Sequence, residues 1–289
     1  MKLIVLGMHR SGTALVTQLF SKLGYFVGTD SDLTDTNEEN PKGFYERRDF
    51  RKINDELLFS NTSDWDKLSR VLVEGFSKDS IENYAVKFKE ILNQLDSKSS
   101  NCVIKEPRFC LTYPYIKPLL REHKVVYVVR NPLDVAYSLY RRNNFPFEFG
   151  LALWEVYNTQ IMNAIDVEST FIVDYDDVVN FNSEVLEGLT SFSGMAKCSF
   201  DDVIDVNLNR SSVHRDSISH YLLSSQSELY NKIRSSIIQP LEITQKIIFI
   251  ASKMPPLAVL LQLTQCLVCS VMLIVQTIIR MKQTIMKTC

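Results

Sequence analysis

Four short runs of mostly apolar residues stand out along the first two thirds of the chain, and each predicts a buried β-strand. The runs cover residues 2–6, 102–105, 123–130 and 170–174. All four are rich in Val, Ile and Leu and lack the strict alternation of a strand that has one face in water. Strands of this kind are typical of a parallel sheet covered on both faces.

Helical spacing of apolar positions fills most of the chain between these runs. The predicted helices cover residues 12–23, 50–58, 81–95, 133–141, 151–165 and 178–192. Strands that alternate with helices predict a three-layer α/β/α fold with a central parallel sheet. Ligands of such sheets bind beyond the carboxyl ends of the strands, so the turns after Leu6, Ile104 and Val129 should converge on one site.

The C-terminal residues differ in composition from the rest of the chain. Residues 254–279 contain no charged side chain, and 257–279 are mostly Leu, Val and Ile. This stretch is long enough to span a bilayer, yet its glutamines fall on one side at helical spacing, as in an amphipathic helix. We expect one domain at residues 1–250 and an apolar helical tail at 251–289. The tail would span or lie on a membrane, or pack on a partner or on the protein itself.

Charge and cysteine content narrow the class of protein. The 289 residues include 32 Lys and Arg against 34 Asp and Glu, a net charge of −2, which argues against a nucleic-acid partner. The six cysteines are scattered and suggest no disulfide framework, and residues 2–6 are too few for a signal peptide. A reducing, cytoplasmic location is expected, at the inner face of a membrane if the tail binds one.

The turn after the first strand has the composition of an anion site. It reads "GMHRSGTAL", with glycines at positions 7 and 12. Backbone N–H groups in such a turn, together with the positive end of the following helix, attract phosphate-like anions. Nucleotide triphosphatases continue with Lys and then Ser or Thr, whereas this chain has Thr13 and Ala14. Arg10 therefore supplies the positive charge, and no metal is expected.

A second motif, "VVRNPLDVAYS", follows the third strand. Arg130 ends the strand and Ser138 lies eight residues later in the next helix. Arginine grips phosphates through two parallel hydrogen bonds, and a serine hydroxyl can share the same anion.

The two motifs, in this order, resemble those of the 3′-phosphoadenylyl-sulfate (PAPS) dependent sulfotransferases, closest to the carbohydrate and bacterial types. The resemblance covers residues 1–193 and implies a P-loop NTPase-like fold with PAPS as the co-substrate. It implies that the first motif binds the 5′-phosphosulfate through Arg10, Ser11, Gly12, Thr13 and Ala14. It implies that Arg130 and Ser138 bind the 3′-phosphate.

Sulfuryl transfer needs a base for the acceptor hydroxyl and positive charge near the leaving oxygen. Arg10 and Lys105, in "VIKEPRF", are the candidate cations, although Lys105 could equally be a strand-end surface lysine. The segment "NPKGFYERR" resembles the base-bearing segment of carbohydrate and tyrosyl-protein sulfotransferases, which makes Glu46 the candidate base. An ordinary salt bridge from Glu46 to Arg47, Arg48 or Arg51 is the alternative.

Other polar residues near the motifs have secondary roles. Glu106 and His9 are reserve bases, His9 is a candidate acceptor contact, and Arg108 could bind an anionic acceptor. Tyr175 and residues 208–215, "LNRSSVHR", lie where the nucleotide could be approached, but are expected to be ordinary surface.

The resemblance implies a carbohydrate or glycolipid hydroxyl as the acceptor, and a membrane-seeking tail suits a lipid-linked one. Two other functions stay open. A P-loop kinase or NTPase is suggested by Asp174, which follows four apolar strand residues as an Mg²⁺-binding aspartate would. A catalytically inactive P-loop binding protein is the other alternative.

Overall fold

The computed structural model describes residues 1–36, 43–205 and 214–237. The chain divides into two compact units. The first, Met1–Asn182 with Cys198–Ile237, contains the sheet and every predicted site residue. In the second, helix α9 (Ser183–Ser193) is followed by Lys197, which forms an ion pair with Glu187 at 2.7 Å. The predicted apolar tail at 251–289 lies outside the described residues.

The sheet has four parallel strands in the order β2-β1-β3-β4. The strands are β1 (Lys2–Leu6), β2 (Cys102–Lys105), β3 (His123–Val129) and β4 (Thr170–Asp174). All four predicted strands and their parallel arrangement are therefore confirmed. In the register, Lys105 lies opposite Val5 and Asp174 opposite Val129, so the turns after β1, β2 and β3 leave the same edge of the sheet.

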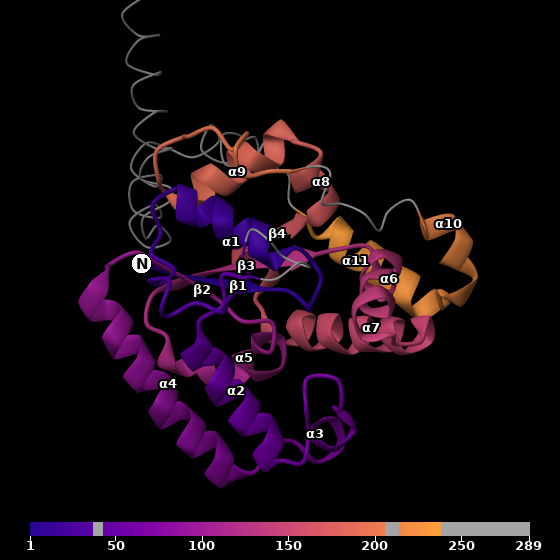
Figure 1. Ribbon diagram of the computed structural model, residues 1–289, viewed down its shortest axis with the longest axis horizontal. Helices are drawn as coiled ribbons and strands as arrows, with labels where there is room; N and C mark the ends of the chain where they lie inside the picture. Colours follow the sequence, from indigo (N-terminus) through magenta and orange to yellow (C-terminus); the bar gives the residue numbers. More distant parts are fainter. Residues whose placement is uncertain (37–42, 206–213, 238–289) are drawn as a thin grey trace, which may run out of the picture. The chain divides into compact units, whose positions relative to one another are not determined.

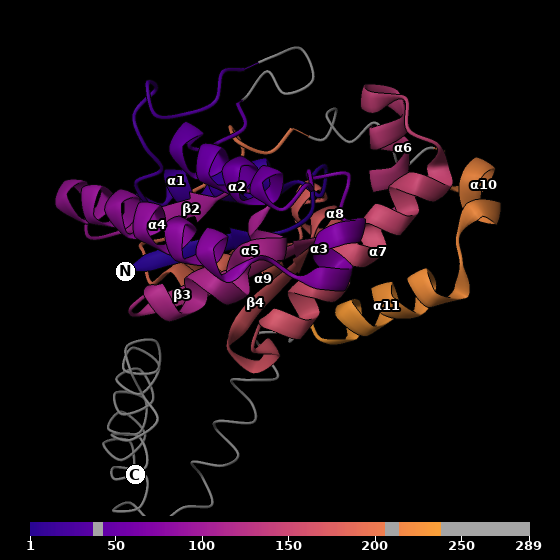
Figure 2. The same ribbon diagram turned by 90° about the horizontal axis from the view of Figure 1, so that it is seen from below.

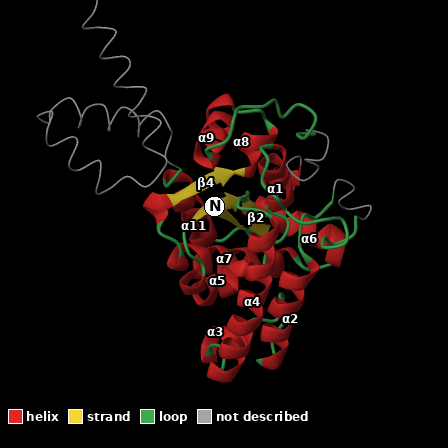
Figure 3. Ribbon diagram, turned by 90° about the vertical axis from the view of Figure 1, so that its left-hand side faces the viewer, coloured by secondary structure: helices red, strands yellow, loops and turns green. Residues whose placement is uncertain are grey.

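Helices cover both faces of the sheet (Figure 1). Helices α1 (Thr13–Lys22) and α8 (Tyr175–Val179) lie on one side, while α4 (Lys78–Lys98), α5 (Phe109–Ile116) and α7 (Phe147–Ala164) lie on the other. Figure 3 shows the strands in yellow between these two groups of helices. The predicted α/β/α layering is confirmed.

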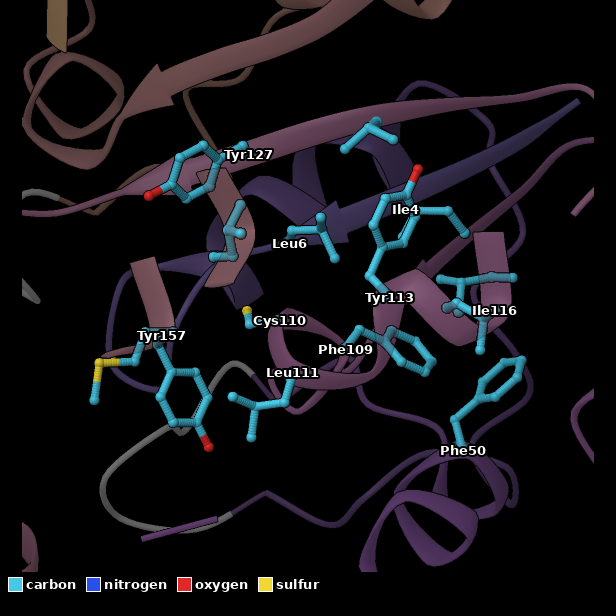
Figure 4. Packing of buried hydrophobic residues seen from close by; sticks show 14 of the residues in the cluster. Ile4, Leu6, Phe50, Phe109, Cys110, Leu111, Tyr113, Ile116, Tyr127 and Tyr157 are labelled. Carbon is cyan, nitrogen blue, oxygen red and sulfur yellow. The ribbon is translucent and has the colours of Figure 1, made fainter. Parts of the chain in front are cut away.

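The larger core lies on the α4, α5 and α7 side of the sheet. Ile4 and Leu6 of β1 point into it together with Phe109 of α5 and Tyr157 of α7 (Figure 4). Alternation along a strand sends Leu3 and Val5 to the opposite face, where α1 covers the sheet. Burial on both faces explains why the strands read as continuous apolar runs.

The remaining helices connect and flank this core. They are α2 (Arg48–Ser60), α3 (Ser69–Glu74), α6 (Pro132–Asn143), α10 (Arg215–Ile218) and α11 (Ser224–Ser235), with 3₁₀ turns at Lys117–Leu119, Val167–Ser169 and Ser219–Tyr221. Figure 2 shows α6 beside α7, and α10 close to α6. None of the helices in the described ranges is long and apolar enough to cross a membrane.

Three helical predictions differ from the structure. The single helix expected at 178–192 is two helices, α8 and α9, because the chain turns at Phe181, whose φ is +56°. Helix α5 was not expected, because it contains Pro114 and begins only two residues beyond Pro107. Helix α11 was also missed, because its polar, serine-rich sequence has only two buried side chains, Gln226 and Ile233.

Candidate active site

The turn between β1 and α1 has the backbone of an anion-binding loop. Arg10 and Gly12 both adopt left-handed conformations, with φ of +70° and +86°. Helix α1 then starts at Thr13 with no side-chain cap and no acidic residue in its first turn. Its first N–H groups and the positive end of its dipole are therefore left for a negatively charged ligand.

Buried polar atoms of the loop also indicate a site for an anion. Ser11 is fully buried, and its hydroxyl has no hydrogen-bond partner among the described residues. The Gly7 N–H donates to the Cys110 Sγ at 3.3 Å, which fixes the start of the loop over α5. A buried hydroxyl without a partner costs free energy, about 1–3 kcal/mol, so Ser11 is suited to a ligand rather than to the fold alone.

The second predicted motif reaches the first one. Arg130 follows β3 directly, and Pro132 begins α6 with Asn131 as its N-cap, accepting from the Leu133 N–H at 3.0 Å. The Arg130 Nη1 donates to the Arg10 carbonyl at 3.0 Å. The Arg10 Nε donates to the Ser138 Oγ of α6 at 2.7 Å. Residues 120 to 128 positions apart thus form one polar cluster, as the parallel topology predicts.

Sequence reasoning missed a network of charges behind Arg130. The carboxylate of Asp134 is fully buried, lies 3.6 Å from the Arg130 Nε, and accepts two hydrogen bonds from Arg215 at 2.8 and 2.7 Å. Arg215 also binds Asp176, and both carboxylates raise its pKa despite partial burial. The i,i+4 spacing of Arg130 and Asp134 was the available signal. Arg215 ends the segment "LNRSSVHR", of which residues 208–213 lie outside the described part.

Tyr175 is not the surface residue that we expected. Only 6 % of it is exposed, and its ring lies beneath the Arg130 guanidinium, 4.3 Å from Cζ to the ring centroid. The same ring packs on Gly12, where an added Cβ would come within 2.0 Å of the Tyr175 Cδ2. Tyr175 therefore holds the two motifs together from below.

Lys105 and Glu46 form a pair. The Lys105 Nζ lies 2.6 Å from the Glu46 Oε1, with side-chain exposures of only 1 % and 12 %. The surface-lysine alternative for Lys105 is therefore wrong. The alternative salt bridge from Glu46 to Arg47, Arg48 or Arg51 is also absent in the described residues. These arginines pair with other carboxylates: Asp32 and Asp49, Asp35, and Asp55.

Glu106 and Arg108 are both buried next to this pair. The Glu106 carboxylate accepts from the Arg108 N–H at 2.9 Å and from its Nη1 at 2.5 Å. The Arg108 Nε lies 2.7 Å from Asp55. Burial raises the pKa of Glu106 to about 7, against the opposing effect of Arg108. The guanidinium of Arg108 is thus held by two acidic side chains of the protein, Glu106 and Asp55.

A cavity of about 250 Å³ opens beside the loop. His9, Phe44, Glu46, Trp65, Arg108 and Arg142 are among the residues that line it. The His9 ring packs on Trp65, with centroids 4.7 Å apart, and burial together with Arg108 and Arg142 holds its pKa well below its usual value. His9 is therefore neutral at pH 7. Glu106 does not line the cavity, whereas Glu46 does.

Asp174, the residue that suggested an Mg²⁺ site, is used by the fold. Its carboxylate caps α8 through the Asp176 N–H at 3.0 Å, accepts from the Tyr230 hydroxyl at 2.7 Å and lies 3.2 Å from the Arg234 Nε. Burial raises its pKa. Across the described ranges, no three or more His, Cys, Asp or Glu side chains are grouped as metal ligands.

Comparison with known proteins decides the family. The sequence profile described as "Sulfotransferase family" matches residues 3–200, more than half of the chain. The chain belongs to the sulfotransferase family. The match covers both anion-binding motifs and ends before α10 and α11, so Arg215 lies outside it.

One solved structure supports the fold of this sulfotransferase. The sulfotransferase domain from the curacin biosynthetic pathway superimposes with a TM-score of 0.52 at 16 % identity, covering 80 % of this chain and 96 % of that domain. The sulfotransferase domain of the Synechococcus PCC 7002 olefin synthase gives 0.45 at 18 % identity, over 88 % and 95 %. No curated protein matches the sulfotransferase by sequence.

The structure brings most predicted site residues of this sulfotransferase together. The loop residues Arg10 to Ala14 and the pair Arg130 and Ser138 form the polar cluster, and Lys105 with Glu46 lies beside the cavity. His9 and Arg108 line that cavity as expected for acceptor contacts, but the guanidinium of Arg108 is held by Glu106 and Asp55. Membership of the family implies PAPS as the sulfuryl donor.

Proposed function

We propose that this enzyme transfers the sulfuryl group of PAPS to a hydroxyl of a carbohydrate or glycolipid acceptor. The observation that carries the proposal is the contact between the two motifs, Arg10 Nε to Ser138 Oγ at 2.7 Å, beside a cavity that contains Glu46. Groups suited to a nucleotide with two separate anionic groups and a group suited to accepting a proton thus meet at one edge of the sheet.

The two anion motifs form the donor site. Arg10, Ser11, Gly12, Thr13 and Ala14 bind the 5′-phosphosulfate through the loop N–H groups, the Ser11 hydroxyl and the Arg10 charge. Arg130 and Ser138 bind the 3′-phosphate. Because Asp134 lies 3.6 Å from the Arg130 Nε and is itself held by Arg215, the direction of the Arg130 side chain is fixed before a ligand arrives.

The chemical step needs few groups. The Glu46 carboxylate takes the proton of the acceptor hydroxyl as that oxygen forms its bond to sulfur. The sulfur–oxygen bond to the 5′-phosphate breaks, and Arg10 and Lys105 stabilise the charge on the departing phosphate oxygen. The position of Lys105 beside the loop, opposite Val5 in the sheet, supports this role.

Two features support a sugar acceptor. The cavity is lined by Phe44, whose flat apolar face suits the apolar face of a sugar ring, and by several hydrogen-bonding groups. A lipid-linked sugar would suit the apolar sequence at 257–279, and we expect the full chain to sediment with phosphatidylcholine vesicles. A chain that stays in the supernatant would remove the glycolipid form of the proposal.

The donor site is tested by calorimetry on the full chain with adenosine 3′,5′-bisphosphate and without magnesium. We expect tight binding that weakens about tenfold or more in Arg130→Ala, since a charge-assisted contact to phosphate is lost. Arg121→Ala is the matched control, because Arg121 is exposed just before the same strand. Binding of ATP with magnesium in place of the bisphosphate would instead support the kinase alternative.

The base is tested by transfer of radiolabelled sulfate from PAPS to sugar acceptors. Glu46→Gln should lower kcat by about 10² or more while leaving bisphosphate binding intact. Glu56→Gln is the control, because Glu56 lies on α2 and pairs with Lys87 away from the site. An unchanged kcat in Glu46→Gln would move the role of proton acceptor to His9, the neutral group in the same cavity.

A further inference from the structure

The acceptor cavity contains several polar atoms that the fold leaves without partners. The His9 Nε2, the Thr34 Oγ1 and the Asn143 Oδ1 are buried, and none has a hydrogen bond to a described residue. All three residues line the cavity of about 250 Å³. Buried polar groups in native proteins are normally satisfied, so three of them around one space indicate a polar ligand.

The cations around this cavity are not equivalent. Arg108 is held by Glu106 and Asp55, and Arg51 lies 3.7 Å from Asp55. Arg142 makes no hydrogen bond or ion pair with any residue in the described ranges. Its charge is nevertheless felt in the cavity, since it helps to lower the pKa of His9.

The carboxylates of the cavity do not neutralise Arg142. The Asp35 carboxylate accepts from Arg48 at 2.6 Å, and Glu46 is paired with Lys105 at the same distance. Both acidic groups on the cavity wall thus pair with other cations, and neither pairs with Arg142.

The position of Arg142 relates it to the donor site. Arg142 and Ser138 lie four residues apart on α6, so their side chains share one helix face about one turn, or 5–6 Å, apart. Ser138 contacts Arg10 of the anion loop, while Arg142 lines the acceptor cavity. One helix face therefore carries a donor contact and, one turn further on, a cation that faces the acceptor.

We infer that the acceptor is an acidic sugar, whose carboxylate or sulfate group is bound by Arg142. This inference rests on the proposed function and narrows its substrate class. The hydroxyl groups of the same sugar would satisfy His9, Thr34 and Asn143. Arg108, the earlier candidate for an anionic acceptor, is already held by two carboxylates, so Arg142 is the specificity-determining residue.

The test uses pairs of sugars that differ only at C6, which is a carboxylate in one and a hydroxymethyl group in the other. Calorimetry on the full chain, saturated with adenosine 3′,5′-bisphosphate, compares p-nitrophenyl β-glucuronide with the β-glucoside, and the galacturonide with the galactoside. We expect the acidic sugar of at least one pair to bind about tenfold or more tightly, because a charge-assisted contact is formed. Labelled PAPS then shows whether the same sugar accepts sulfate.

Three variants assign the preference. Arg142→Ala should bring the acidic sugar to the affinity of its neutral partner, and Arg142→Lys should keep part of the preference, because it keeps the charge but not the planar fork. Arg141→Ala should change neither affinity, since Arg141 is exposed like Arg142 but lies on another face of α6 and does not line the cavity.

Several outcomes would overturn the inference. These are equal binding of acidic and neutral sugars, no binding of either, or an Arg142→Ala variant that loses affinity for both sugars alike. Weaker bisphosphate binding in Arg142→Ala would place Arg142 in the donor site and also overturn it. Failure of the wild-type chain to bind the bisphosphate at all would instead contradict the function on which the inference rests.

Discussion

At the scale of single residues, Gly12 shows how tightly the donor loop is built. Its φ of +86° is strained for any other residue, and the Tyr175 ring occupies the space that a Cβ would need. The two effects are separable, because Gly24, which ends α1 in a left-handed turn with φ of +100°, has nothing within 4 Å of its Cβ position.

We therefore expect Gly12→Ala to be much more damaging than Gly24→Ala. Gly24→Ala should lower the free energy of unfolding by about 1 kcal/mol through backbone strain alone. Gly12→Ala should cost a further 1–3 kcal/mol or so through overpacking against Tyr175, and should weaken bisphosphate binding. Urea denaturation and calorimetry of both variants measure this, and equal losses would show that the Tyr175 contact is unimportant.

At the scale of elements, the salt-bridge network connects three helices around Arg130. Arg215 of α10 binds Asp134 of α6 and Asp176 of α8, and Asp134 in turn lies near Arg130. A buried carboxylate that loses its cation is strongly destabilising, whereas an exposed ion pair contributes little.

Arg215→Ala should therefore lower the free energy of unfolding by about 2 kcal/mol and weaken bisphosphate binding several-fold. The reason is that Asp134 then keeps only Arg130 as a neighbouring cation and competes with the ligand for it. Arg215→Lys should restore part of both. Lys197→Ala, which breaks the exposed pair with Glu187, should change neither measurably. Unchanged bisphosphate affinity in Arg215→Ala would separate this network from the donor site.

The four strands, their parallel arrangement and the two anion motifs could be predicted from the sequence, because each depends on a local pattern of residues. Residues 3–6 of β1 are apolar throughout, and the glycines after them permit the positive φ angles that the turn needs. The partners of side chains could not be predicted in the same way. Glu46 lies 59 residues from Lys105, and Arg215 lies 81 from Asp134, so neither pair leaves a local signal.

At the scale of the whole molecule, buried ionisable groups make stability depend on pH. Glu106 is fully buried and its pKa is raised to about 7, while that of an exposed glutamate is near 4.5. The folded chain therefore binds a proton at Glu106 over a pH range in which the unfolded chain has released it. Stability from this group is present below pH 4.5 and is lost as the pH rises towards 7.

We expect Glu106→Gln to gain stability relative to the wild type as the pH rises from 5 to 7. The difference should change by at most about 1.4 kcal/mol per pH unit, the limit for one proton. Urea denaturation at pH 5, 6 and 7 measures it, with Glu90→Gln on the exposed face of α4 as the control. A constant difference across this range would mean that Glu106 is charged throughout.

Asp174 is synthesised well before the residues that bind its carboxylate. Tyr230 and Arg234 of α11 follow it by more than fifty residues, and Arg215 follows Asp134 by eighty-one. A nascent chain that has just completed the sheet therefore carries Asp174 without Tyr230 and Arg234, and Asp134 beside Arg130 but without Arg215. The order of translation thus makes the C-terminal part of this unit, beyond the region matched by the family profile, the last step in maturation of the donor site.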